Sequence, residues 1–542
     1  MRITNKIMQR NNLSNINTNK VNEDRLSNQM STEKKINRPS DDPVVAIRAL
    51  RLRSSVSEVT QYYSRNIPDA ESWINVTEDA LNNLTQILTN LITQCNKGSN
   101  NYLETSDREI ILEQIKSLAK EIYATGDADY AGRYVFTGYR TDTSLSFTEE
   151  ENTFFDITEQ LDVSAIDDVT KVYTDELLNI NGSNYMDVDV TEQEIYAVTC
   201  HRIRLAYNDC VGNGNETPSI TFKQLRQKVD ETSGEPMFDS NGNPVPEIGE
   251  DGKPIYDTIT WDDIKTMHSY EDPYSEAANN PDAIVYVPET GEILLGENKY
   301  NQLMAVKDDA STVGDEGEIR VNYQKEHWQK GDLRPQHYFA CTANPNDDEK
   351  RIEYNPTFLD ENPERQFIEY DVGFNQTIRI NSTADECFQH GIGREADDLI
   401  AAMQNVKDLE DVQARLTKLM KEAEGDEEKT AHLQKQMDAV EKALTLAKDK
   451  EQKLFESSIT AFQGYLDDAN LCITNCGNRG SKLSLIENRM KTQKTTFETL
   501  KSENEDIDIA EVTIQLKSAE LVYEAALLAA GKVMQATLLN YI

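Results

Sequence analysis

Residues 509–533 read IAEVTIQLKSAELVYEAALLAAGKV. Apolar side chains recur in this stretch at spacings that alternate between three and four, at Ile509, Val512, Leu516, Ala519, Tyr523, Ala526, Ala530 and Val533. This spacing is typical of a helix that packs lengthwise against a partner helix. The stretch therefore predicts a helix whose apolar seam needs a partner.

A second seam lies near the other end of the chain. It consists of Leu52, Val56, Val59, Tyr63, Asn66, Ala70, Trp73, Thr77, Ala80, Leu84, Ile87 and Leu91. Further apolar residues such as Ile67, Ile74, Leu81 and Leu88 widen this seam, as is usual for a core of several helices. We expect the two seams to be partners of each other, so that both chain ends build one helical bundle.

The first forty residues predict a weaker helix and a capped turn. Residues 1–30 are rich in Asn and carry a ragged apolar seam, so this helix should become ordered only against a partner. Residues 37–43 read NRPSDDP, in which Pro43 suits the first helical turn and Asp41 or Asp42 suits the cap. The seam residues that we single out are Ile3, Ile7, Leu13, Ile16 and Val21, and the linker residues are Asn37, Pro39, Ser40, Asp41, Asp42 and Pro43.

The middle of the chain differs in composition from both ends. Twelve of the fifteen prolines fall between residues 218 and 363, among tight-turn sequences and short β-like runs. Residues 132–139 alternate like a strand, whereas residues 407–453 are highly charged and suit a helical hairpin that breaks at Gly425. The chain is thus expected to be mainly α with a β-rich insertion. The expected parts are 1–40, 41–144 and 386–505 as helical segments, 145–385 as one or two β-rich outer domains, and 506–542 as a terminal helix.

Charge is spread unevenly along the chain. The net charge is −41, which argues against nucleic acid and anionic membranes as partners. Residues 149–385 hold roughly 50 acidic residues against roughly 18 basic ones. The first forty residues are net positive and the last forty net negative, so the two ends are expected to attract each other or the ends of neighbouring molecules. The alternative is two solvated faces without mutual preference.

No motif in the sequence indicates catalysis, a cofactor or a metal. The seven cysteines are scattered, and Cys472 and Cys476 are interpreted as ordinary helix residues one turn apart rather than zinc ligands. Residues 239–250 resemble a calcium-binding loop, but Pro244 stands where the sharp turn needs glycine, so a polar hairpin is the preferred interpretation. No apolar run is long enough to cross a membrane, and the N-terminus lacks the pattern of a cleaved signal peptide.

Several short stretches near the N-terminus carry a family resemblance. Residues 1–8 (MRITNKIM), 29–32 (QMST) and 37–43 (NRPSDDP) are similar to the N-terminal region of the bacterial flagellin superfamily, and residues 132–139 (GRYVFTGY) resemble a strand in that family. The Asp-Asp-Pro form is that of its hook–filament junction proteins, whereas flagellins usually continue with Asp-Asp-Ala-Ala-Gly. The family usually has glycine where Glu33 stands, so we expect the turn after Ser31 and Thr32 to have a different backbone conformation from that of the family.

The C-terminal end carries the same resemblance. Residues 502–508 (SENEDID), 523–527 (YEAAL) and 538–542 (LLNYI) are similar to the C-terminal helix of the superfamily. The match covers roughly 145 residues at the front of the chain and roughly 150 at the back. The acidic middle resembles nothing that we can name.

The resemblance implies a flagellin-like fold in which both chain ends form an axial core and variable domains face outward. It implies self-association in a helical tube, with the first hook-associated junction protein on the hook side and flagellin on the filament side. The terminal helices would be largely unstructured in the monomer. Export through the flagellar type III apparatus would precede an extracellular location in the flagellum. A cytoplasmic export chaperone would shield the C-terminal assembly residues, which are Val512, Leu516, Ala519, Tyr523, Ala526, Ala530, Val533, Leu538 and Leu539.

The expected role is therefore a structural adaptor without enzyme activity. Two alternatives remain open at the level of the sequence. One is the bulk flagellin subunit of a filament. The other is a surface adhesin or binding module, in which residues 145–385 are the working part and the helices are a stalk.

Overall fold

The computed structural model describes residues 5–100, 103–174, 176–212, 218–229, 237, 245–249, 254–306, 317–360 and 362–535, with side chains left out at residues 5 and 533–535. By its internal contacts the chain divides into two compact units. Unit 1 comprises Met1–Glu71, Glu369–Ile378 and Arg479–Ile542, and unit 2 comprises Ser72–Ile368 and Arg379–Asn478. Each unit therefore combines segments that lie far apart in the sequence.

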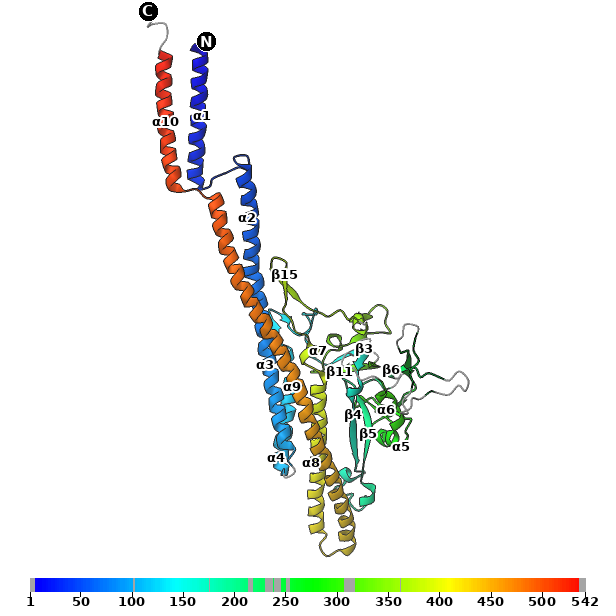
Figure 1. Ribbon diagram of the computed structural model, residues 1–542. Coiled ribbons are helices and arrows are strands. Elements are labelled where there is room, and N and C mark those ends of the chain that lie inside the picture. The colour runs from blue at the N-terminus through cyan, green and yellow to red at the C-terminus, as the bar shows by residue number, and fades with distance from the viewer. Residues whose placement is uncertain are drawn as a thin grey trace, which may run out of the picture. The chain divides into compact units, whose positions relative to one another are not determined.

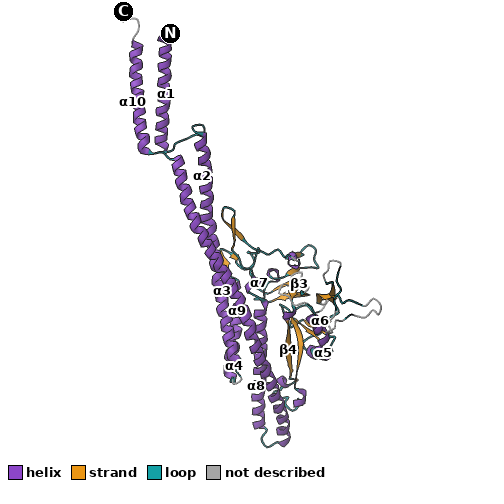
Figure 2. Ribbon diagram, viewed as in Figure 1, coloured by secondary structure: helices purple, strands orange, loops and turns teal. Residues whose placement is uncertain are grey.

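Helices dominate both ends of the chain, as Figures 1 and 2 show. The β-strands all fall in the region between them, which makes the fold mainly α with a β-rich insertion. The helices are α1 (Asn5–Thr32), α2 (Pro43–Gln61), α3 (Ile67–Gly98), α4 (Thr105–Gly126), α5 (Pro273–Asn279), α6 (Glu297–Met304), α7 (Ala384–Cys387), α8 (His390–Glu422), α9 (Glu427–Glu505) and α10 (Ile509–Gln535).

Two larger sheets and two short hairpins make up the β-rich region. The six-stranded sheet has the order β13-β12-β3-β11-β6-β7, the five-stranded sheet has the order β4-β5-β10-β9-β8, and the hairpins are β1-β2 and β14-β15. The strands are β1 (Asp129–Tyr130), β2 (Arg133–Tyr134), β3 (Glu151–Leu161), β4 (Ile166–Tyr173), β5 (Tyr196–Arg204), β6 (Ser219–Leu225), β7 (Tyr256–Trp261), β8 (Lys265–Thr266), β9 (Ile284–Val287), β10 (Glu292–Leu295), β11 (Ile319–Trp328), β12 (Ala340–Ala343), β13 (Ile352–Tyr354), β14 (Glu369–Gly373) and β15 (Gln376–Arg379).

The strand predicted over residues 132–139 is mostly wrong. Only the two residues of β2 are extended there, and turns follow directly after them. Gly138 adopts a positive φ of 61°, which a continuous strand does not allow. The apolar residues Val135 and Phe136 are instead buried within this sequence of turns. The alternation of apolar and polar residues over 132–139 therefore reflects burial of apolar side chains in a compact loop and not pairing in a sheet.

The helix of the first seam is interrupted just before Pro68. Residues 62–66 form one π-helical turn between α2 and α3, and the Ile67 amide donates to the Tyr62 carbonyl, five residues back. Proline has no amide hydrogen and crowds the carbonyl four residues before it, so it disturbs the regular hydrogen-bond ladder of a helix. A π turn next to the proline accommodates this disturbance. The irregularity expected at Pro68 thus lies in the turn that precedes it.

The two seams are not partners of each other, contrary to the sequence prediction. Within unit 1, α10 packs against α1, and α2 lies beside the C-terminal part of α9 (Figure 1). The Asn504 side chain of α9 donates to the Val45 carbonyl of α2 at 3.2 Å, and Lys494 lies over the Tyr63 ring. The pairing changes because the chain breaks at residues 506–508, so that α10 leaves the line of α9.

A helical bundle of α3, α4, α8 and α9 forms the core of unit 2. The residues that α3 buries there include Trp73, Leu81, Leu84, Leu88 and Leu91, all from the predicted seam or its widened face. Their spacing follows the helical period, which explains why one side of α3 is apolar along its length.

Helices α3 and α9 approach each other closely. The Cys476 thiol of α9 donates to the Ile74 carbonyl of α3 at 3.5 Å. Gly98 sits so close to Phe455 that a Cβ atom would lie 2.3 Å from the ring. Cys472 and Cys476 are both buried helical residues, as the sequence interpretation expected.

The five-stranded sheet contacts α8 through buried ion pairs. Arg202 of β5 is 4% exposed and binds Asp167, Glu292 and Asp398 at 2.6–3.1 Å. Arg204 binds Asp398 at 2.6 Å and also pairs with Glu395. Burial alone would raise the pKa of Asp398, but the two guanidinium groups hold that pKa below its usual range. These ion pairs hold the five-stranded sheet against α8.

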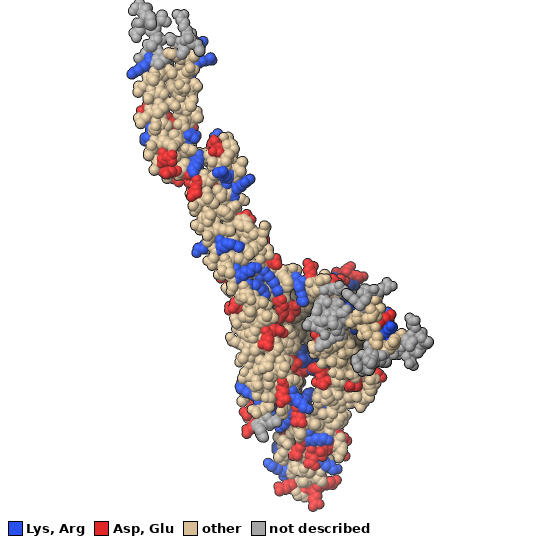
Figure 3. Space-filling view, in the orientation of Figure 1, with Lys and Arg blue, Asp and Glu red and all other residues tan. Residues whose placement is uncertain are grey.

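The α8–α9 hairpin forms where the charged sequence predicted it, with a break at Gly425, whose φ is +102°. Acidic side chains gather at its tip (Figure 3). The hairpin is covered along one side by residues 177–195, whose Leu177, Ile180 and Ile195 are completely buried against it. A part of the β-rich insertion therefore stabilises the helical hairpin.

A buried carboxyl group in the six-stranded sheet makes the stability of unit 2 depend on pH. Glu159 of β3 is 2% exposed, accepts a hydrogen bond from the Ala206 amide at 2.8 Å, and accepts another from the Tyr323 hydroxyl. Burial raises the pKa of Glu159 to about 7, and the two hydrogen bonds only partly oppose this rise. The folded state therefore holds a proton that the unfolded state releases between pH 4.5 and pH 7.

We expect Glu159→Gln to flatten the pH dependence of stability. The native contribution of Glu159 is complete below about pH 4.5 and is lost as the pH rises through about 7, by about 3 kcal/mol in total. The difference in the free energy of unfolding between the variant and the parent should therefore grow from pH 4.5 to pH 8. Urea unfolding followed by tryptophan fluorescence measures it, because Trp73, Trp261 and Trp328 all lie in unit 2. Parallel pH profiles would contradict the buried, protonated carboxyl.

Candidate assembly surface at the chain ends

The predicted C-terminal seam lies on the side of α10 that packs against α1. Val512 is buried, and the later seam residues Leu516, Ala519, Tyr523, Ala526 and Ala530 are half-buried. Val533 lies in the last turn of α10, whereas Leu538 and Leu539 fall outside the described residues. The resemblance implied that both terminal helices are unstructured in the monomer, but the structure shows them as helices that contact each other.

A second apolar face of α10 was missed by the sequence reasoning. Ile514, Leu521 and Leu528 are 71%, 67% and 71% exposed, and Val522 and Leu527 beside them are also exposed. The first three residues are spaced by seven, which places them on one line along the helix. This spacing was visible in the sequence. A helix that is apolar on two sides needs more partners than one α1 helix supplies.

Helix α1 leaves most of its predicted seam exposed. Ile7, Leu13 and Val21 are 50%, 59% and 69% exposed, Ile16 is half-buried, and Leu26 near the base of the helix is buried. Ile3 lies outside the described residues. The steps of five residues from Ile16 to Val21 and from Val21 to Leu26 do not follow the helical period, so one partner cannot cover all of these side chains.

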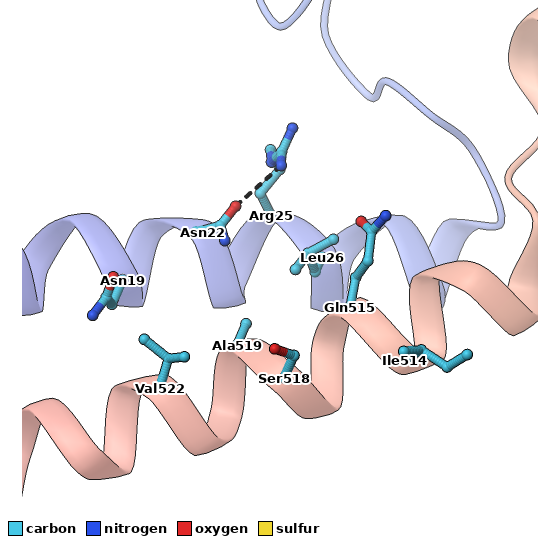
Figure 4. A pocket seen from close by; sticks show the side chains of 9 residues that line it. All are labelled: Asn19, Asn22, Arg25, Leu26, Ile514, Gln515, Ser518, Ala519 and Val522. Carbon is cyan, nitrogen blue, oxygen red and sulfur yellow. Dashed lines mark hydrogen bonds between the residues drawn. The ribbon is translucent and has the colours of Figure 1, made fainter.

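The contact between α1 and α10 is incompletely filled. A groove of about 400 Å³ runs between the two helices, and Figure 4 shows the side chains that line it. In Figure 4, Asn19 of α1 stands opposite Val522 of α10, and Asn22 stands opposite Ala519, so polar side chains of α1 occupy positions where a closed helix pair would hold apolar ones. In Figure 3 the visible face of these two helices is largely free of charge between its ends. The surface formed by α1 and α10 is therefore open and largely uncharged, and it exposes apolar side chains such as Leu13, Val21 and Leu521.

The two linkers that lead to α1 and α10 are paired with each other. The Lys35 amide donates to the Glu505 carbonyl at 2.7 Å, and the Ile507 amide donates to the Glu33 carbonyl at 3.1 Å. Arg53 of α2 binds the buried Glu505 carboxylate with two hydrogen bonds, at 2.6 and 2.8 Å, and this pairing holds the pKa of Glu505 below its usual range. We call residues 33–35 and 505–507 the connector.

The predicted cap is present at the start of α2. The Asp42 carboxylate accepts from the amides of Val44 and Val45 at 2.9 and 3.1 Å, and Pro43 occupies the first turn. Asp41 instead closes the preceding turn, where it accepts from the amides of Asn37 and Arg38. Pro39 and Ser40 lie within this turn and are exposed. The linker motif therefore fixes where α2 begins.

Glu33 occupies a left-handed conformation, with a φ of 55°, so the turn keeps the backbone that glycine would favour. This conformation costs a residue with a Cβ atom about 1–2 kcal/mol, and the conformational entropy of an unfolded glycine offsets part of that cost. We expect Glu33→Gly to stabilise the connector by about 0.5–1 kcal/mol. Hydrogen exchange of the Ile507 amide should slow accordingly. Glu33→Ala is the control, because it keeps the strain; equal slowing in both variants would show that strain is not the cause.

More apolar side chains are exposed on the neighbouring helices of unit 1. Val44, Ile47 and Leu50 of α2 are 54–64% exposed, and Leu485 and Leu500 of α9 are 74% and 43% exposed. Val44, Ile47 and Leu50 recur every three residues, on a different side of α2 from the seam that begins at Leu52. Exposed apolar area of this extent is typical of a surface that binds other protein.

Groups of metal-binding side chains and membrane-spanning helices are both absent from the described residues. Within them, no group of three or more His, Cys, Asp or Glu side chains is placed to hold a metal ion. The residues of the calcium-like loop, 239–244 and 250, lie outside the described part of the chain. None of the helices that the structure describes has the length and apolar character of a membrane span.

Comparison with known proteins places these features in a family context. Residues 3–141 match the family described as bacterial flagellin N-terminal helical region. Flagellar hook-associated protein 3 of Escherichia coli K12 is 29% identical over 170 residues, which cover 30% of this chain and 53% of that protein. The Salmonella typhimurium protein of the same name is 27% identical over 146 residues, covering 27% and 45%. The chain thus spans about half the length of these curated relatives.

A flagellin and two solved structures are also similar. The flagellin of Clostridium tyrobutyricum is 31% identical over 122 residues, covering 22% of this chain and 32% of that protein. The solved structure of a flagellar hook-associated protein from Vibrio parahaemolyticus has 12% identity and a TM-score of 0.33, covering 86% of this chain and 100% of that one. Hook-associated protein 3 of Legionella pneumophila has 10% identity and a TM-score of 0.29, covering 83% and 97%.

The family match begins in helix α1 and continues through α2 and α3, which carry the seam from Leu52 to Leu91, and through α4. The resemblance found in the short N-terminal motifs is confirmed. Residues 3–141 of this chain match the bacterial flagellin N-terminal helical region, and the chain is similar to flagellar hook-associated protein 3 over about half the length of that protein.

Proposed function

We propose that this protein is a structural adaptor of the bacterial flagellum, which joins the hook to the flagellin filament and has no enzyme activity. The relatives named hook-associated protein 3 support a location between hook and filament. The open surface of α1 and α10, with its exposed apolar side chains, supports assembly through these two helices. That surface is the single observation on which the proposal depends. An isolated soluble protein gains nothing from such exposure, whereas a subunit of a larger assembly buries it.

The assembly that we propose is a helical tube. A head-to-tail contact that does not close into a ring repeats along a helix, and the two faces of α10 allow such a contact with several neighbours at once. The first hook-associated junction protein would bind on the hook side and flagellin on the filament side. Copies of this chain would fill the zone between them.

Export fits the same surface. We propose that a cytoplasmic flagellar chaperone covers the seam from Val512 to Val533 before export, because this apolar seam would promote aggregation whenever it is not packed against α1. The protein would then leave the cell through the flagellar type III apparatus and act outside it, in the flagellum.

Deletion of the gene is the direct test. We expect deletion cells to keep hooks, to lack filaments, and to release flagellin into the medium. Electron microscopy of the cells and immunoblots of the medium measure these outcomes. Normal filaments in the deletion strain would overturn the proposal.

A flagellin role is the second candidate, because the flagellin of Clostridium tyrobutyricum matches at 31% identity. Abundance separates the two roles. A filament subunit dominates a preparation of sheared flagella, whereas a junction adaptor is a trace component at the proximal ends. Quantitative mass spectrometry of sheared flagella distinguishes these results.

A further inference from the structure

A cavity of about 690 Å³ lies in unit 2, at the end of strands β4 and β5 where the five-stranded sheet meets α8 and α9. Figure 1 shows β4 and β5 beside α8. The volume falls within the usual range of small-molecule sites in proteins. The cavity is far in sequence from the assembly surface, and nothing in the proposed adaptor role requires it.

Two lysines from different elements line this cavity. Lys171 comes from β4 and Lys450 from α9, and neither forms an ion pair within the described part of the chain. Burial lowers the pKa of Lys450, and the positive charge of Lys171 lowers it further, which the carboxylates of Asp398 and Glu292 oppose only in part. The Lys171 ammonium also lies 5.6 Å from the centre of the Tyr274 ring. A bound anion would offset the effect of Lys171 on Lys450.

An aromatic platform stands beside the lysines. Tyr173 and Tyr196 are directly paired across β4 and β5, and their rings stack with centres 4.9 Å apart. Tyr196 remains 47% exposed and lines the cavity. Cross-strand stacking explains why the two rings contact each other. It does not explain why the exposed ring stands next to two lysines that lack carboxylate partners.

Hydrogen-bonding groups complete the lining. Glu176, Glu194 and Asp272 supply carboxylate acceptors, and Asn405 of α8 supplies an amide that both donates and accepts. The three acidic side chains repel a doubly charged anion such as phosphate or a dicarboxylate more strongly than a singly charged one, and such small anions would leave the aromatic ring unused. A ligand with one negative charge, several hydroxyl groups and an apolar ring face would use every part of the lining.

We propose that this cavity binds an acidic saccharide, a sugar that carries a single carboxylate such as a hexuronic or sialic acid. Its carboxylate would lie between Lys171 and Lys450, and its ring would lie against Tyr196. Its hydroxyl groups would donate to the acidic side chains of the lining. The site is independent of the adaptor role, so failure of one proposal leaves the other standing.

Calorimetric titration of the full-length protein tests the proposal. The probes are N-acetylneuraminic acid and glucuronic acid, with glucose as the neutral match of glucuronic acid and with inorganic phosphate as a simple anion. We expect at least one acidic sugar to bind at least tenfold more tightly than glucose and phosphate. Binding of neither acid at millimolar concentration, or equal binding of glucose or phosphate, would overturn the proposal.

Variants locate the binding. Lys171→Gln combined with Lys450→Gln should weaken binding of the acidic sugar at least tenfold, and Tyr196→Ala should weaken it several-fold. Tyr196 and Lys171 are exposed, so replacing them should leave the fold intact, which circular dichroism checks. Lys453→Gln is the matched control, because Lys453 is an exposed lysine one turn further along α9 that does not line the cavity. Binding that survives the double variant, or that falls equally in Lys453→Gln, would place the sugar elsewhere and overturn the assignment.

Discussion

Leu521→Asp is expected to leave the monomer folded and to abolish filament attachment. Leu521 lies in the middle of the second apolar face of α10 and is 67% exposed, so its replacement removes little packing from the isolated chain. If neighbouring subunits cover this face, each copy would bury an unpaired carboxylate, at a cost of several kcal/mol per subunit. Complementing the deletion strain with this variant should give at least tenfold fewer cells with filaments than the parent gene.

A matched control separates assembly from charge. Lys517→Gln lowers the charge of the same helix by one unit, as Leu521→Asp does, at an exposed polar position that does not line the α1–α10 groove. It should restore filaments to most cells. Leu516→Asp changes the half-buried seam toward α1, so it should weaken the α1–α10 contact as well as assembly. Normal filaments with Leu521→Asp would mean that the second face of α10 has no role in assembly.

Arg108→Ala is expected to destabilise unit 2 by about 3–5 kcal/mol. Arg108 of α4 is 5% exposed and binds Glu451 of α9 at 3.0 and 3.2 Å and Glu410 of α8 at 3.1 Å. Its removal leaves Glu451, which is 3% exposed, without its cation. Burial already raises the pKa of Glu451, so the loss of stability should be smaller at pH 5, where the carboxyl can take up a proton, than at pH 8. Urea unfolding at the two pH values measures both effects.

A double variant tests the cause. Arg108→Leu with Glu451→Leu removes both members of the buried pair, and Lys448 still binds Glu410 at 2.9 Å. Replacing a complete buried ion pair by apolar side chains often costs little, so the double variant should regain most of the stability lost in Arg108→Ala. If it is as unstable as Arg108→Ala, the destabilisation comes from lost packing around α4 rather than from an unpaired charge.

Local pattern was enough to predict several elements. Helix α10, the cap at Asp42, the hairpin break at Gly425 and the β-rich character of the middle all follow from spacing or from the preferences of single residues. Such features depend on neighbours within a few positions, so the sequence contains the necessary information. The short motifs of both ends likewise carried the family resemblance, and the match over residues 3–141 confirms it for the N-terminal end.

Partner choice could not be read from the same patterns. The seam of α10 and the seam of α3 have compatible spacing, yet α10 packs against α1, and α3 packs against α9. An apolar stripe states that a helix needs a partner but does not state which one, because many stripes fit equally well. The connector determines which helix α10 packs against. Its residues 33–35 pair with residues 505–507, and this pairing brings α1 and α10 together.

The sequence by itself determined which segments are helical, where they begin, and that both ends carry apolar faces. Only the tertiary structure decided which of those faces are covered. It left Ile514, Leu521 and Leu528 open, and it gathered Lys171, Lys450 and Tyr196 around one cavity from three separate elements. The physical reason is that helix formation follows from near neighbours in the chain, whereas exposure and cavities depend on residues hundreds of positions apart.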